Sequence, residues 1–460
     1  MARVASVKNA LIPALGGPLG AHARAEGIFF RPLPWALLVG TVLFAVAYLR
    51  HVPCLTTSPD NPINAYIRAC YSDIPHSYLW HGWAAGGSPL GTEASIAAPL
   101  IAVFVASALQ LARLFGAEIG ADASEHAQYA GTPAFFGAST LLLFVCFLAT
   151  IIASAAIAER RGRPWDVMLI AASPAVFAAG LTSWELLPLS LTAAGFALLV
   201  TRHRLAGAIV FGLAAAASPL AYAFIAGVLA ALGLRRQWLR LWHFGAVSLG
   251  TALALHLPIL LTRSSAAEHY WKQVVDSDIG PGSVWFLLQE LGLPLRDFGP
   301  FTAVVTLLVL AIILALAHLT ERTPSAGTAS AIILLVIVLL APSYPPQLGV
   351  WVVFALFAAI PVSVGHWVYS FVLAVHYLAV WGWLGGHLRS DQHGPWGLYY
   401  LAVLLRFGFE IVWLVLLFRQ FPPRRSLPDD LVEVRRRHAD GDGNLVTHGS
   451  GGTGAIDEDE

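Results

Sequence analysis

The densest group of polar side chains in this sequence lies between residues 54 and 83. It holds two aspartates, Asp60 and Asp73, two histidines, His76 and His81, and several tyrosines and tryptophans. A carboxylate can take the proton from a sugar hydroxyl, and aromatic rings can stack on sugar faces, so these residue types suit chemistry on a carbohydrate. A second interpretation is a solvated loop whose aromatic side chains mark the membrane interface. For Asp60, within a Pro-Asp-Asn-Pro segment, a role as a turn residue is the stronger interpretation.

The elements that must position these residues are membrane helices. Of the 460 residues, 57% are hydrophobic and only 12% are charged, whereas roughly 25% are charged in a soluble chain. The apolar runs show no period of two, which predicts an all-α, polytopic transmembrane bundle of about 12 spans. A net charge of zero gives no indication of a basic surface that binds nucleic acid. The runs are Trp35–Leu49, Ser95–Phe115, Ala134–Ala158, Asp166–Thr182, Trp184–Val200, Leu205–Ala217, Pro219–Leu234, Phe244–Leu261, Phe301–His318, Ala329–Leu340, Val350–Val364, Trp367–Leu384 and Leu398–Phe418.

Arginine clusters predict the orientation of the bundle, because cytoplasmic loops are enriched in basic residues. They occur at 159–163, 202–204, 235–240, 320–323 and after Phe418. If Ser95–Phe115 and Ala134–Ala158 both crossed the membrane fully, the cluster at 159–163 would lie outside. All the clusters are inside only if Ser95–Phe115 is re-entrant or lies shallow in the membrane. The resulting division is a cytoplasmic arm over 1–34, a membrane domain over 35–420 and a disordered cytoplasmic tail over 421–460. Loops 50–92 and 263–300 then lie outside a plasma membrane, with both termini in the cytoplasm.

The cysteines of the sequence are compatible with one disulfide bond but do not require it. Cys54 and Cys70 flank the first external loop, where a disulfide is permitted on the outer side of a membrane and would stabilise the fold by roughly 3 kcal/mol. Two free thiols are the equally weighted alternative. Cys146 lies within an apolar run and is expected to be a buried, unreactive thiol.

Several segments in order along the chain resemble one membrane-enzyme family. The segment ACYSDIP at 69–75, followed by Tyr78, Gly82 and the GSP at 87–89, resembles the first external loop of the polyprenol-phosphate-sugar-dependent glycosyltransferases of the GT-C superfamily. More narrowly, it is similar to glycosyltransferase family 87, the mannosyltransferase-like membrane proteins of mycobacteria. Further similar blocks, covering residues 50 to 420 together with the first, are RPWD at 163–166 with SP at 173–174, SWELL at 183–187, LAG to GLAA at 205–215, GSVWFLLQ at 282–289, YPPQ at 344–347 with Trp351, and Arg406.

The resemblance implies a GT-C-like fold and a transfer reaction on the external face. A hexose, with mannose as the expected sugar, would pass from a polyprenyl-phosphate donor to a cell-envelope glycan or glycolipid among the membrane lipids. Asp73 matches the catalytic base, and Glu93 is the second candidate acid, although the Tyr-Pro pair expected after it is replaced here. The expected substrate contacts are Arg68, Tyr71, Tyr78, His81, Glu185, Lys272 and Gln347. No metal cluster is apparent and no cofactor is assigned, although a divalent cation is compatible with the chemistry.

Departures from the family pattern support an alternative. Ser218, Pro342, Ala374 and His81 stand where the family carries charged residues, so few cations remain to meet a phosphodiester. The chain could therefore be a catalytically silent GT-C relative that binds a lipid or a partner enzyme in envelope assembly. A transporter is less well supported. Many transporters have broken helices at corresponding positions in two repeated halves, whereas this sequence shows one candidate break, at 218–219, with no partner in the other half.

Two further acids carry two interpretations each. Arg406 and Glu410 lie four residues apart in the last apolar run, so they share a helix face and form either a functional intramembrane site or, preferably, a buried neutralising pair. Glu185 precedes an apolar run beside Trp184. It could orient acceptor hydroxyls or simply interact with a helix dipole.

Overall fold

The chain is helical throughout the part that the computed structural model describes, residues 31–58, 62–89, 98–262, 264–295 and 298–419. This confirms the predicted all-α class. The helices are α2 (Pro32–His51), η2 (Val52–Cys54), α3 (Asp73–Trp80), α4 (Pro99–Leu114), α5 (Glu125–Ala130), α6 (Thr132–Arg160), η3 (Pro164–Val167), α7 (Met168–Ala171), α8 (Pro174–Ala179), α9 (Leu186–Val200), α10 (Arg204–Ala215), α11 (Ala221–Leu234), α12 (Trp238–Thr262), α13 (Ser264–Val275), α14 (Val284–Glu290), α15 (Phe298–Leu319), α16 (Ala326–Leu340), α17 (Leu348–Ala359), α18 (Val364–Leu384), η4 (Ser390–Gln392) and α19 (Trp396–Arg419).

Within the described residues, six helices are long and apolar enough to span a membrane: α2, α6, α12, α15, α18 and α19. The other apolar helices are 10–17 residues long, and at about 1.5 Å per residue they fall short of the roughly 30 Å hydrocarbon core. Helix α4 belongs to this shorter group, and the re-entrant or shallow placement of Ser95–Phe115 stays a prediction. The structure therefore indicates a multi-pass membrane protein, and the number of about 12 spans stays a prediction.

One predicted run is broken where its sequence contains a serine followed by a proline. Asp166–Thr182 forms η3, α7 and α8 in place of one helix. Pro174 has no N–H to continue a helix, and the Ser173 hydroxyl caps the new helix by accepting from the Val176 N–H at 3.3 Å. The break turns the chain so that residues 180–185 form a loop beside the first external loop.

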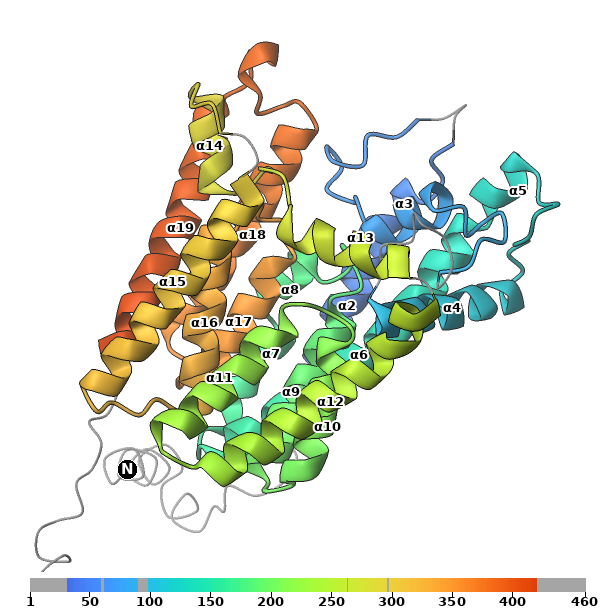
Figure 1. Ribbon diagram of the computed structural model, residues 1–460. Helices are drawn as coiled ribbons and strands as arrows, with labels where there is room; N and C mark the ends of the chain where they lie inside the picture. The colour runs from blue at the N-terminus through green and yellow to red at the C-terminus, as the bar shows by residue number, and fades with distance from the viewer. Residues whose placement is uncertain (1–30, 59–61, 90–97, 263, 296–297, 420–460) are drawn as a thin grey trace, which may run out of the picture.

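Small residues allow the central helices to approach closely. Helix α11 packs against α16, and α9 packs against both α6 and α10. At Gly227 of α11, any added Cβ would overlap the backbone nitrogen of Ser330 in α16. Helix α18 packs against α19, and α15 packs against α16. Figure 1 shows these helices at one side of the bundle, with α9 to α12 in its middle and lower part.

Short helices occupy the loops that were predicted to be external. In Figure 1, α3, α5, α13 and α14 lie toward one end of the molecule, away from the turn between α11 and α12. Serine side chains begin three of them: Ser72 caps α3, Ser124 caps α5 and Ser283 caps α14. These caps fix the direction in which each loop helix leaves the bundle.

The first helix begins slightly earlier than predicted. Helix α2 starts at Pro32, which extends into the arm assigned to residues 1–34, because proline is well tolerated in the first turn of a helix. The predicted tail over 421–460 lies outside the described residues.

Candidate active site

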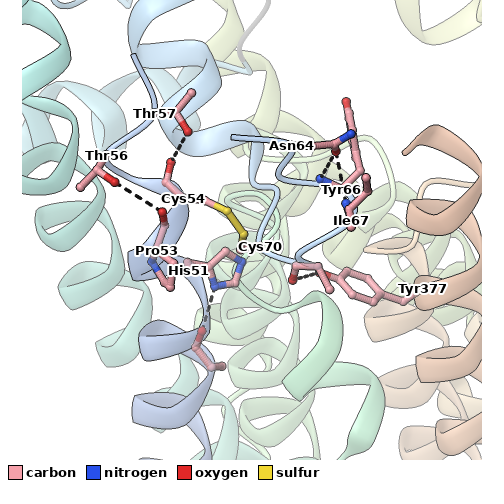
Figure 2. The surroundings of a disulfide bond; sticks show 12 residues. His51, Pro53, Cys54, Thr56, Thr57, Asn64, Tyr66, Ile67, Cys70 and Tyr377 are labelled. Atoms are coloured by element: carbon pink, nitrogen blue, oxygen red, sulfur yellow. Dashed lines mark hydrogen bonds between the residues drawn. A yellow bond between two sulfur atoms is a disulfide. The ribbon is translucent and has the colours of Figure 1, made fainter. Parts of the chain in front are cut away.

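The first external loop is tied to the bundle at two points. A disulfide joins Cys54 and Cys70, whose Cα atoms lie 6.1 Å apart (Figure 2). The Tyr377 hydroxyl of α18 donates to the Ala69 carbonyl at 3.0 Å. Between these points the Asn64 carboxamide accepts from two backbone N–H groups at 3.2 Å and forms a local turn. The segment that leads to Asp73 is therefore held on both sides, and the pairing predicted as one of two options is present.

Hydrogen bonds hold Asp73 against the loop that connects α8 to α9. The Asp73 N–H donates to the Thr182 carbonyl at 2.7 Å, and the Ser72 hydroxyl donates to the Leu181 carbonyl at 2.7 Å. Ser72 also accepts from the Ile74 N–H, so the same side chain caps α3 and docks it. The position of Asp73 is thus determined by two segments that are far apart in the sequence.

The carboxyl group of Asp73 is partly exposed and has the electrostatics of a general base. Burial raises the pKa of this carboxyl, while a hydrogen bond from Tyr71 and the nearby His76 oppose the rise. A base with a pKa above the ordinary carboxyl range is more effective at accepting a proton from a hydroxyl near neutral pH. Asp73 therefore has the raised basicity that favours proton abstraction.

Aromatic rings surround the Asp73 side of the loop. The Tyr66 and Tyr71 rings stack with centroids 4.6 Å apart, and Trp381 of α18 lies 5.3 Å from Tyr71. The His76 and Trp80 rings stack at 5.7 Å on α3. Trp381 is buried beneath this group, whereas the Tyr66, Tyr71, His76 and Trp80 rings are at least partly exposed and can stack against the faces of a sugar, as expected for Tyr71.

Glu185 is the second carboxylate of the site. The Trp351 indole of α17 donates to its Oε2 at 2.7 Å. Burial raises the pKa of Glu185, the hydrogen bond from Trp351 and the nearby Ser218 hydroxyl oppose the rise, and the charge of Asp73 adds to it. The two carboxyl groups are therefore within electrostatic range. Although Glu185 is the residue before α9, it makes no capping hydrogen bond, so its partner is a side chain from another helix.

The amphipathic helix α13 closes over Glu185 from the second external loop. Burial raises the pKa of Tyr270, and the charges of Glu185 and Tyr222 add to the rise. The neighbouring Trp271 ring lies 6.2 Å from Tyr222 and 5.8 Å from His256. Tyr270 was not predicted, although its place in a stretch of aromatic and charged residues was a usable signal.

Unpartnered polar atoms gather immediately before Glu185. Among the described residues, the buried Thr182 and Ser183 hydroxyls and the Trp184 indole N–H have no hydrogen-bond partner. The Gln347 Oε1, one helical turn before Trp351 on α17, is also buried and unpartnered. Buried polar atoms are usually hydrogen-bonded, so this group is suited to a polar ligand such as a sugar.

Several predicted contacts lie elsewhere. Tyr78 is fully buried and stacks on Phe135 at 4.7 Å, so it belongs to the core and is not available to a substrate. Arg68 is exposed on the loop that the disulfide closes, and His81 ends α3 beside Trp83, at 5.3 Å between ring centroids. Glu93 and Asp60 lie outside the described residues.

Lys272 also points away from the carboxylates. It pairs with Glu268 at 2.7 Å, and both side chains are 65% exposed. Two residues along a helix correspond to a rotation of about 200°, so Lys272 and the inward-facing Tyr270 lie on opposite sides of α13. The predicted phosphate contact is therefore oriented toward solvent in this structure.

Arg50 is a cation near the first loop that the sequence interpretation missed. It lies in the last turn of α2, donates to the Ala178 carbonyl at 2.7 Å and lies over the Tyr377 ring at 5.3 Å. It makes no ion pair with any described carboxylate. Arg50 supports the site, because it joins α2 to α8 and to the tyrosine that holds Ala69.

The Arg406–Glu410 pair is a separate, structural feature. Arg406 Nη1 lies 2.6 Å from Glu410 Oε2, and the two side chains are 1% and 0% exposed. Arg406 Nη2 donates to the Gly282 carbonyl at 3.1 Å, and its guanidinium lies 3.7 Å from the centroid of the Tyr344 ring. The pair thus anchors the second external loop, as the neutralising interpretation expects.

No group of three or more His, Cys, Asp or Glu side chains that could hold a metal ion occurs in the described part of the chain. The arrangement around Asp73 offers proton transfer and sugar stacking as its chemistry. In comparisons with known proteins, no family model matches this chain and no curated protein sequence is similar to it.

Proposed function

We propose that this protein is a membrane glycosyltransferase of GT-C type that moves a hexose from a polyprenyl-phosphate donor to an acceptor hydroxyl on the external face. Mannose is the expected sugar, and a cell-envelope glycan or glycolipid is the expected acceptor. The observation that carries the proposal is the position of Asp73, a partly exposed carboxyl group of raised pKa held beside stacked tyrosines. The resemblance of the first loop to this enzyme class supports the same reaction.

In the proposed reaction, Asp73 takes the proton of the acceptor hydroxyl as its oxygen attacks the anomeric carbon of the donor. The new bond joins that oxygen to the anomeric carbon, and the bond between the carbon and the phosphate oxygen breaks. Polyprenyl phosphate leaves with the bonding electron pair. A single displacement inverts the anomeric configuration.

Glu185 replaces Glu93 as the supporting acid in this proposal. Its Oε2 accepts from Trp351, so Oε1 is the oxygen that would accept from an acceptor hydroxyl. The unpartnered Thr182 and Ser183 hydroxyls are next to it in the sequence and would bind further hydroxyl groups. Together these groups would orient the sugar while Asp73 removes the proton.

The test is sugar transfer in membranes that contain the full chain, with labelled polyprenyl-phosphate mannose as donor and an envelope-lipid extract as acceptor. We expect Asp73→Asn to lower the rate about 10²- to 10⁴-fold, the usual contribution of a general base. Asp122→Asn is the matched control, because Asp122 is an exposed aspartate in the segment between α4 and α5. Equal rates for wild type and Asp73→Asn would show that Asp73 is not the base.

A second candidate function is a non-catalytic relative that binds a lipid or a partner enzyme. The pairing of Lys272 with Glu268 and the pairing of Arg406 with Glu410 favour it, because both remove cations from the set expected to bind the donor phosphate. No transfer by the wild type, with a related active transferase as positive control, would favour this function.

A further inference from the structure

A cavity lies at the opposite end of the bundle from Asp73. It has a volume of about 760 Å³ and is formed by the ends of α6, α9, α10, α11, α12, α16 and α17. In Figure 1 the turns between α9 and α10 and between α11 and α12 lie at the lower end, whereas α3 and α13 lie toward the upper end. The arginine clusters predict that this lower end faces the cytoplasm.

Four arginines line this cavity without a carboxylate. They are Arg161, Arg204, Arg235 and Arg240. No described Asp or Glu lines the cavity, and none forms an ion pair with these arginines. The lining therefore carries a concentrated positive charge, which is offset only at Arg161, where the charge of Asp166 acts from outside the cavity.

Neutral oxygen atoms hold three of the guanidinium groups in place. Arg161 donates to the carbonyl groups of Phe357 and Ala358 at the end of α17. Arg235 donates to the Pro324 carbonyl at 3.0 Å, and Arg240 donates to the Gln237 side chain at 2.9 Å. Each guanidinium has five N–H donors, so donors remain for an anion after these bonds are made.

The start of α16 adds to the same positive field. Ser325, which caps the helix, and Ala326 and Gly327 of its first turn all line the cavity. The N-terminal end of a helix carries a partial positive charge and favours phosphate groups. The helix end and the arginines therefore attract the same kind of ligand.

The interior of the cavity is apolar. Phe196, Leu199, Leu232 and Phe244 line it beneath the arginines. A free phosphate or an acidic peptide would leave this surface uncovered, whereas a lipid places its phosphate on the arginines and an acyl chain on the apolar wall. Arginines that served only to set the orientation of the protein in the membrane could lie anywhere in the cytoplasmic loops and would not need to surround a cavity.

We propose that this cavity binds an anionic phospholipid from the membrane leaflet at the end of the bundle opposite Asp73. Arg204, Arg235 and Arg240 contact the phosphate headgroup, and the apolar wall holds an acyl chain. Basic pockets between membrane helices are known to bind phosphate headgroups in this way. The site is independent of sugar transfer, since none of its residues belongs to the Asp73 and Glu185 group.

The test is native mass spectrometry of the purified full chain with phosphatidylglycerol or phosphatidylcholine added. We expect retention of phosphatidylglycerol, and about 100-fold weaker retention by the triple variant Arg204→Gln, Arg235→Gln and Arg240→Gln, from about fivefold for each cation. The matched control changes Arg160, Arg202 and Arg236 to Gln, which removes the same charge from the same end of the bundle at positions that do not line this cavity. The control should retain the lipid as the wild type does.

Four results would overturn the proposal. Equal loss in both triple variants would indicate only surface charge, and equal retention of both lipids would remove the requirement for an anionic headgroup. Displacement by glycerol phosphate at the same concentration would indicate a free-phosphate site. Stronger lipid retention after the terminal acids at 457–460 are changed to amides would indicate that the tail is the resident occupant.

A second measurement needs no variant. Phosphatidylglycerol with a photoreactive acyl chain is added to the wild-type chain, and the labelled peptides are identified. We expect labels on α9 and α12, which contribute Leu199 and Phe244 to the apolar wall. Labels confined to the outer surfaces of α15 or α19 would contradict the proposed position.

Discussion

Neutralising Glu410 should destabilise the protein strongly. Glu410 Oε2 lies 2.6 Å from Arg406 Nη1, and Oε1 accepts from the Tyr369 hydroxyl at 3.0 Å. In Glu410→Gln, the buried Arg406 keeps its charge but loses the only carboxylate that pairs with it among the described residues, while its contacts with the Gly282 carbonyl and the Tyr344 ring remain. Removing one partner of a buried ion pair costs about 3–5 kcal/mol, which lowers the folded-to-unfolded ratio about 150- to 5,000-fold.

The reason for this loss is tested by a double variant. Arg406→Met combined with Glu410→Gln removes both charges, so most of the stability should return. The exposed pair formed by Arg389 and Asp391 at 3.3 Å provides the control, and Arg389→Gln should cost at most about 1 kcal/mol. The measurement is the fraction of monodisperse protein after stepwise heating in detergent, read by size-exclusion chromatography.

Two results would refute this reasoning. A Glu410→Gln variant as stable as the wild type would show that the pair contributes little to the fold. A double variant as unstable as the single one would show that the loss does not come from an unpaired charge. If Glu410→Gln kept its stability but lost sugar transfer, the pair would have a functional role in place of a structural one.

Two further predictions concern the first external loop. Replacing Cys54 and Cys70 by alanine should destabilise the protein by about 3 kcal/mol and increase proteolysis between them; unchanged proteolysis would contradict the role of the disulfide. Tyr71→Phe removes a hydrogen bond that lowers the pKa of Asp73, so that pKa should rise. Because Asp73 must be ionised to accept a proton, the acidic limb of the pH–rate profile should move to higher pH, and a limb that stays in place would exclude this contact.

Apolar runs predicted the helices well because a segment in lipid must satisfy its own backbone hydrogen bonds. The break at Ser173 and Pro174 was also present in the sequence, as a cap followed by a residue without an N–H. The role of Tyr78 was predicted wrongly, because an aromatic residue type is common to cores and to sugar sites. The partnership of Trp351 with Glu185 could not be predicted, since it depends on how two distant helices pack.

The residues around Asp73 are brought together from the first loop, the loop before α9, helix α13 and helix α17. During synthesis, Trp351 is made long after Glu185, so this acid has no indole partner until α17 enters the bundle. Packing of α17 is consequently the step that completes the site, and it depends on contacts of long sequence separation, which form late. Residue 351 lies about three quarters of the way along the 460 residues, so chains interrupted before it would lack the indole partner of Glu185, and the complete site would form only in longer chains.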